Sequence, residues 1–179
     1  MKLSHFCTCI LILFFYQIDF LQAQTKSKLT YEIKAKQKWN SDHETERPEE
    51  GKDHLVLNAD STIDILTSFG DEKLLQEFNK QGLEKTLAQL LNAKNKIQSL
   101  VSDDPVVIKN SKVEDFSDGK KISIETDFTY GIKKYHSIEH YFLFENKVLH
   151  TVLRWNELSN SEQVELAKND FKAILVKMK

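Results

Sequence analysis

The sequence predicts an α+β protein in which an antiparallel sheet of about six strands, rich in meander connections, is sandwiched between a central helix and a C-terminal helix. Three observations predict this fold. Two segments carry apolar residues at spacings of three and four, the pattern of a helix that buries one face. Several others alternate apolar and polar residues, the pattern of a strand. Turn residues such as Asp118 and Gly119 separate the alternating segments at hairpin spacing.

Residues 1–23 have the composition of a secretory signal peptide. Lys2 precedes a short apolar run, and a Leu-Gln-Ala tripeptide ends at Ala23. The run is shorter than the roughly 20 residues that cross a bilayer. Cys7 and Cys9 do not follow the run, where a lipoprotein would need its acylated cysteine. We therefore expect cleavage after Ala23 and a periplasmic or secreted protein that has no membrane insertion after cleavage.

Residues 24–179 are then expected to fold as a single α+β domain. Both cysteines are lost with the leader, which excludes disulfides, thiol nucleophiles and thiolate metal sites from the mature chain. The formal net charge is −2, and the loss of Lys2 and Asp19 together leaves it unchanged. This balance gives no basis for nucleic-acid binding.

The first elements of the domain are expected to be strands. Leu29, Tyr31 and Ile33 alternate with polar residues as in a half-buried strand. A charged segment at about 40–54 lacks apolar periodicity and is predicted to be an exposed loop. The segments 55–59 and 62–69 then form a predicted hairpin.

The central helix is predicted over about 71–94. Leucines and Phe78 recur there at spacings of three and four, and Asp71 and Glu72 stand at its N-terminal end. Gly82 lies inside this pattern. Because glycine costs about 1 kcal/mol relative to alanine in a helix, we expect a kink or a split into two helices there.

Residues 105–155 are expected to form an antiparallel meander. A two-residue turn at Asp118 and Gly119 would pair Val113 with Ile124. The next hairpin, with its turn at 145–146, places Ile138, His140, Phe142 and Phe144 on one face with Leu149, Thr151, Leu153 and Trp155, and His150 on the other. Both faces carry apolar residues, so both need a cover.

The C-terminal segment is predicted to be that second cover. Ser159 and Glu162 form a capping-box pattern, and apolar residues follow at helical spacing from Val164 to Met178. We therefore expect the chain to end in an amphipathic helix.

The histidines of the segment 135–150 do not predict a metal site. On a strand that rises about 3.3 Å per residue, His136 and His140 lie roughly 13 Å apart, whereas each ligand of a zinc ion lies about 2 Å from it. His140 and His150 point to opposite faces. The glycines are scattered singly and no G-x-S-x-G motif occurs, so neither a phosphate loop nor a serine nucleophile is predicted. We expect no cofactor and no metal.

The order of the predicted elements resembles that of the PsbP-like (Mog/PsbP) family, with Phe171, Ile174 and Leu175 matching the close of its last helix. The resemblance covers nearly all of residues 24–179 and implies an antiparallel sheet between helices. The family includes photosystem extrinsic subunits, a Ran-binding protein and many exported bacterial proteins. No functional residue carries over from it.

Together these features favour an exported, non-enzymatic binding or interaction module for an unidentified protein or small-molecule partner. The alternative is a small-ligand carrier or an enzyme, with a pocket near Trp39, His54, His140 and Trp155, where aromatic and titratable side chains would converge.

Overall fold

A computed structural model describes residues 29–41, 53–57, 62–70, 72–116, 119–144 and 147–178. The chain divides into two compact units: one comprises Glu32–Leu175, and the other includes Met1–Tyr31 and Val176–Lys179. The predicted signal peptide, its cleavage point and most of the predicted charged loop lie outside the described residues.

Two helices and runs of consecutive antiparallel strands make an α+β fold, which confirms the predicted class. In chain order they are β1 (Leu29–Ile33), β2 (Asn40–Ser41), β3 (Asp53–Val56), β4 (Ile63–Gly70), α2 (Glu72–Gln98), β5 (Val107–Phe116), β6 (Gly119–Tyr130), β7 (Lys133–Phe144), β8 (Lys147–Asn156), α3 (Ser161–Lys172) and β9 (Ile174–Met178). β1 and β9 form a two-stranded sheet. The other strands form an antiparallel sheet in the order β2-β3-β4-β8-β7-β6-β5.

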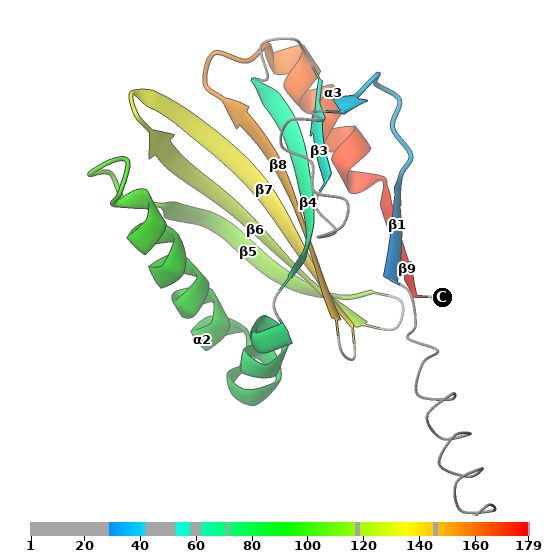
Figure 1. Ribbon diagram of the computed structural model, residues 1–179, viewed down its shortest axis with the longest axis vertical. Coiled ribbons are helices and arrows are strands. Elements are labelled where there is room, and N and C mark those ends of the chain that lie inside the picture. Colours follow the sequence, from blue (N-terminus) through cyan, green and yellow to red (C-terminus); the bar gives the residue numbers. More distant parts are fainter. Residues whose placement is uncertain are drawn as a thin grey trace, which may run out of the picture. The chain divides into compact units, whose positions relative to one another are not determined.

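The two helices cover opposite faces of the larger sheet (Figure 1). α2 packs its leucines and Phe78 against one face, on a core made of Ile122, Ile124, Tyr141, Leu143 and Val148. α3 lies on the other face, where the ring of Phe171 stacks on His140. Since neighbouring residues of a strand point to opposite faces, Tyr141 and His140 mark the two sides. We call these sides the α2 face and the α3 face.

α2 is interrupted where the sequence predicts. Gly82 has φ 77° and ψ −177°, a conformation outside the helical region that glycine adopts without steric cost. Thr86 donates a hydrogen bond to the Gly82 carbonyl at 2.8 Å. The helix continues to Gln98, one turn beyond the predicted end.

The β7–β8 register agrees with the prediction, whereas the β5–β6 register does not. His140 pairs with Thr151 and Phe142 with Leu149, as expected from the apolar pattern. Val113 pairs with Ile122 and not with Ile124. The pairing is displaced by two residues, which leaves Val113 on its predicted face. A bulge between Ile108 and Asn110 reverses the alternation beyond it, so Val107 pairs with Asp127 on the opposite face.

The C-terminal segment departs from the prediction. α3 ends at Lys172, and Ile174–Met178 form strand β9. The cap also differs: the side chain of Asn160 accepts a hydrogen bond from the Gln163 amide at 3.1 Å, while the Ser159 hydroxyl donates to the Thr62 carbonyl. Phe171, Ile174, Leu175 and Met178 recur at helical spacing, but Ile174, Val176 and Met178 also alternate as in a strand, and β-branched residues favour the strand.

The two ends of the predicted loop at 40–54 belong to the sheet. Asn40 and Ser41 pair with Val56 and Leu55, and His54 lies within β3 with its side chain buried. Both ends of the segment 40–54 are therefore strands, and its charged composition did not predict their backbone pairing.

Candidate functional site

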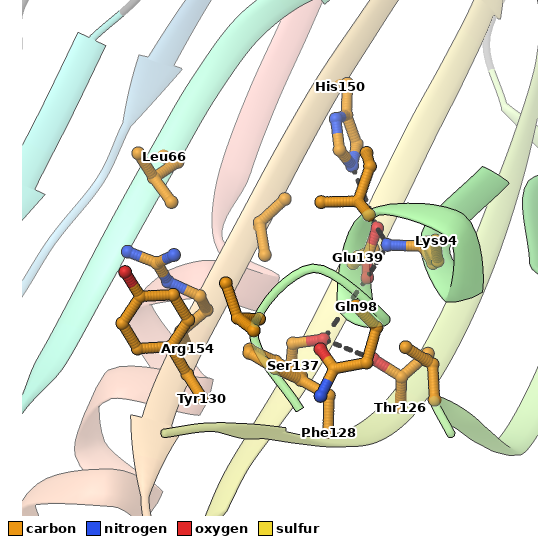
Figure 2. Close-up of a pocket in the computed structure, with 14 residues that line it drawn as sticks. Leu66, Lys94, Gln98, Thr126, Phe128, Tyr130, Ser137, Glu139, His150 and Arg154 are labelled. Atoms are coloured by element: carbon orange, nitrogen blue, oxygen red, sulfur yellow. Dashed lines mark hydrogen bonds and ion pairs between the residues drawn. The ribbon is translucent and has the colours of Figure 1, made fainter. Parts of the chain in front are cut away.

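A pocket of about 320 Å³ lies between the end of α2 and the sheet (Figure 2). Helix α2 and the segment that follows it supply one wall, and strands β4, β6, β7 and β8 supply the floor. The apolar lining residues are Leu66, Ile97, Val101, Val106, Phe128, Tyr130 and Val152, and the polar ones are Lys94, Gln98, Thr126, Ser137, Glu139, His150 and Arg154.

Glu139 is the centre of the polar floor. Its carboxylate is 2% exposed and receives Lys94 Nζ at 2.6 Å on Oε1 and 2.8 Å on Oε2. Tyr141 donates its hydroxyl to Oε2 at 3.0 Å, and Ser137 donates to Oε1 at 3.2 Å. His150 Nε2 lies 3.1 Å from Oε2. Both carboxylate oxygens are thus fully engaged by neighbouring side chains.

These contacts determine the ionisation of the floor. Burial by itself raises the pKa of Glu139, but the His150 hydrogen bond and the Lys94 charge outweigh it and lower the pKa to about 2. Burial and the nearby Glu139 charge raise the pKa of the Tyr141 hydroxyl far above its usual value. The ring of His150 stacks on that of Tyr141 at a centroid distance of 4.1 Å. Near neutral pH the floor therefore holds an ionised carboxylate and a neutral phenol.

A second charged cluster lies at the β4 side of the pocket. Arg154 Nε donates to Asp64 Oδ1 at 3.0 Å, and its Nη2 bonds Oδ2 of the same carboxylate. His54 Nε2 lies 2.8 Å from Asp64 Oδ2. Burial alone lowers the pKa of Arg154, but the Asp64 hydrogen bonds and charge raise it overall, so the guanidinium stays charged.

The end of α2 is tied to the sheet by side-chain hydrogen bonds. Gln98 Nε2 donates to the Thr129 carbonyl, and Asn95 Oδ1 accepts from the Val106 amide at 2.7 Å. With the Lys94–Glu139 pair, these contacts fix the wall of the pocket against β6 and β7.

The arrangement suits binding better than acid–base chemistry. A carboxylate with a pKa of about 2 and both oxygens occupied is a weak base at neutral pH. The charged groups of the floor neutralise one another, which leaves apolar walls as the surface offered to a ligand.

Sequence reasoning missed Lys94 and Glu139, although the pattern contains a signal for both. Lys94 falls on the apolar stripe of α2, following Leu87 and Leu90 at helical spacing. Glu139 stands between Ser137 and Tyr141 on an inward-facing row of β7. A charge at a buried position needs a partner of opposite sign, and this pair satisfies that need.

The four residues predicted to share a site are divided between the two faces. His54 lies opposite Leu66, which pairs with Val152, so its side chain is on the α2 face beside Asp64. His140 and Trp155 lie on the α3 face. Trp39 Nε1 donates to Asp170 Oδ2 of α3 at 3.0 Å. One pocket containing all four is therefore not formed.

His140 is enclosed by aromatic rings. It stacks on Phe171 at 4.6 Å and meets the edge of Phe142 at 5.8 Å. Burial is the main cause that lowers the pKa of His140 to about 4, and the positive charge of Lys121 is the next largest. Ser123 and Thr151 flank it on the neighbouring strands, and their buried hydroxyls find no hydrogen-bond partner among the described residues.

Trp155 is half-buried between His136 and α3. His136 stacks on its ring at 5.5 Å, and Lys168 Nζ lies 4.9 Å from the ring centroid. Cavities of about 320 Å³ adjoin it, and several of the charged side chains that line them are paired, as in the bonds of Asp127 with His136 and of Glu165 with Lys168.

The described residues contain no group of three or more His, Cys, Asp or Glu side chains placed to hold a metal ion. Within the same ranges, no helix is both long and apolar enough to cross a membrane.

Comparison with known proteins gives distant structural matches. No family model and no curated protein matches the chain. Among solved structures, PA94 of Pseudomonas aeruginosa, a protein of unknown function described as a candidate regulator, aligns with a TM-score of 0.46 and 8% identity over 86% of this chain and 85% of its own. LpqN of Mycobacterium tuberculosis, involved in cell envelope biogenesis, aligns with a TM-score of 0.40 and 6% identity over 86% and 87%. These matches assign no role to this chain.

Proposed function

We propose that this protein is an exported, non-enzymatic binding module that holds a small ligand with an apolar chain or ring in the pocket between α2 and the sheet. The observation that carries the proposal is the contrast between the apolar walls of this pocket and its internally neutralised floor. A ligand that enters gains contact with apolar side chains and does not need to break the Glu139 network.

The size of the pocket limits the ligand. A volume of about 320 Å³ lies at the lower end of the range of small-molecule sites, roughly 300–1,000 Å³. The pocket is partly open, so a longer ligand would leave a polar end in solvent. An alkyl or aryl amphiphile with one apolar segment fits these features.

Export is supported by the leader composition of residues 1–23. The resemblance of the element order to the PsbP-like family, which includes many exported bacterial proteins, supports the same proposal. The intact mass of protein recovered from periplasm or medium tests it. We expect a chain that begins at Gln24, and a mass that retains residues 1–23 or an acyl chain would contradict export by cleavage.

Titration calorimetry with linear alkyl carboxylates and alkanols of increasing chain length tests binding. We expect affinity to rise about fourfold with each added methylene until the pocket is full, because each buried CH₂ contributes about 0.8 kcal/mol. We also expect a negative heat-capacity change. Affinity that is independent of chain length would contradict the proposal.

The variant Val152→Trp, which places a large ring in the pocket, should abolish binding. Ile138→Trp is the matched control, because Ile138 lines a cavity on the α3 face. Denaturant unfolding shows whether each variant is folded. Equal loss of binding in two folded variants would place the ligand elsewhere.

A further inference from the structure

Large apolar side chains are exposed at one end of the sheet. At the end of α2, Ile97 is 68% exposed and Leu100 is 81% exposed. At the end of β6, Tyr130 is 61% exposed, and in the β6–β7 connection Ile132 is 98% exposed. We define the apolar tip as these four residues together with Val101 and Leu158, which are also exposed.

Three hydrogen bonds hold the parts of the apolar tip together. Gln98 of α2 donates to the carbonyl of Thr129, next to Tyr130. Thr129 Oγ1 donates to Asp104 Oδ2 at 3.1 Å. The Glu157 amide donates to the Lys134 carbonyl at 3.1 Å, which places the turn containing Leu158 beside the start of β7. The end of α2, the β6–β7 connection and the end of β8 lie at the same end of the sheet (Figure 1).

The apolar tip adjoins the pocket. Ile97, Val101 and Tyr130 belong to both, since each lines the pocket and is also exposed. A ligand that enters between α2 and β6 therefore passes across exposed apolar side chains. Large exposed apolar side chains gathered at one end of a fold indicate an interaction site.

Charge around the apolar tip is balanced. The exposed lysines there are Lys96, Lys133 and Lys134, and the exposed acids are Asp103, Asp104 and Glu157. No excess of one sign points to an oppositely charged protein or to nucleic acid. The partner is therefore one that recognises apolar side chains and tolerates mixed charge.

We propose that the apolar tip docks on the surface of a lipid bilayer, so that the pocket opens toward the membrane. This inference rests on the proposed function, because an amphiphile with an apolar chain resides in a bilayer and reaches the pocket across the tip without crossing water. Leu100 and Ile132 enter the boundary of the acyl chains, and Tyr130 occupies the headgroup level, where its ring and hydroxyl each find a suitable medium. The contact is peripheral.

Co-sedimentation with phosphatidylcholine vesicles tests the proposal. We expect the protein to partition onto these vesicles and the double variant Leu100→Ser, Ile132→Ser to lose at least about tenfold in partition coefficient. Leu166→Ser, which replaces an exposed leucine of α3, is the control and should partition like the unmodified protein. Adding phosphatidylglycerol should change partition little, since the lysines and acids balance.

Ligand binding is measured separately from vesicle binding. The double variant should keep its affinity for dodecanoate in solution, and Val152→Trp should keep its affinity for vesicles. Failure of the unmodified protein to bind dodecanoate would contradict the proposed function. Failure of the protein to partition onto vesicles, with dodecanoate binding intact, would contradict the membrane inference alone. Self-association that depends on Leu100 and Ile132, without partition onto vesicles, would identify the apolar tip as a contact between two copies and overturn the proposal.

Discussion

Lys94 of α2 and Glu139 of β7 form a two-pronged ion pair across the wall of the pocket, with Nζ 2.6 Å and 2.8 Å from the two carboxylate oxygens. The carboxylate is 2% exposed, and it retains three further contacts when the lysine is absent. The pair therefore joins the helix to the sheet at the site of proposed binding.

Replacing Lys94 by Met should lower the free energy of unfolding by about 3 kcal/mol, because it leaves a buried carboxylate without its cation. Urea denaturation measures the change. Lys120→Met is the control, since Lys120 pairs with Asp115 at the surface and its loss should cost well under about 1 kcal/mol. Equal losses in the two variants would show that the Lys94 pair has no special role in stability.

Glu139 should make stability fall in strong acid. Its pKa is lowered from 4.5 to about 2, so the unfolded chain binds a proton on this group at a pH where the folded protein does not. The contribution, on the order of 3 kcal/mol, is present above pH 4.5 and is lost as pH falls toward about 2. Across this pH range, the free energy of unfolding should depend less on pH for Glu139→Gln than for the unmodified protein. Identical pH profiles of the two proteins would contradict the low pKa of Glu139.

Protonation of His140 should lower stability at higher pH than protonation of Glu139 does. Burial lowers its pKa from 6.5 to about 4, so the unfolded chain binds the proton first and stability falls as pH drops from 6.5 to about 4. The ring proton resonances of His140 report this pKa directly in an NMR titration. A midpoint near 6.5 would mean that the ring is hydrated, and His140→Phe should remove this part of the pH dependence.

Phe171 tests whether α3 is part of the folded core. Its side chain is 1% exposed and stacks on His140, so Phe171→Ala should cost about 3–5 kcal/mol. Leu166→Ala removes an exposed side chain of the same helix and should cost under about 1 kcal/mol. Small and equal costs in chemical denaturation would mean that α3 packs only weakly on the sheet.

The sequence predicts the faces of the sheet better than the pairing of its strands. Alternation fixes which side a residue occupies, and a register displaced by two residues leaves those sides unchanged. This explains why the partner of Val113 was wrong while its face was right. Gly119 was predicted to lie in the β5–β6 turn, but it pairs with Phe116 as the first residue of β6, and this displaces the register. In the β7–β8 hairpin the turn lies where it was predicted, and the predicted pairs of His140 and Phe142 are confirmed.

The periodicity of the sequence predicts neither strand β9 nor the pocket. Residues 171–178 satisfy helical and strand periodicity at once, so pairing with β1 decides the outcome for β9. The pocket depends on contacts between segments far apart in sequence, such as Lys94 with Glu139 and Gln98 with Thr129. Aromatic and histidine content pointed instead to Trp39, His140 and Trp155, which are engaged in packing on the α3 face.

The most direct test of the account is a methyl NMR titration of the protein with dodecanoate. We predict saturable shifts of the methyl signals of residues that line the pocket on the α2 face, namely Leu66, Ile97, Val101, Val106 and Val152. The buried methyl groups of Leu149 and Leu153, which lie on the α3 face, should not move. Shifts confined to the α3 face, or no saturable shift of any methyl signal, would contradict the claim that this pocket is the binding site.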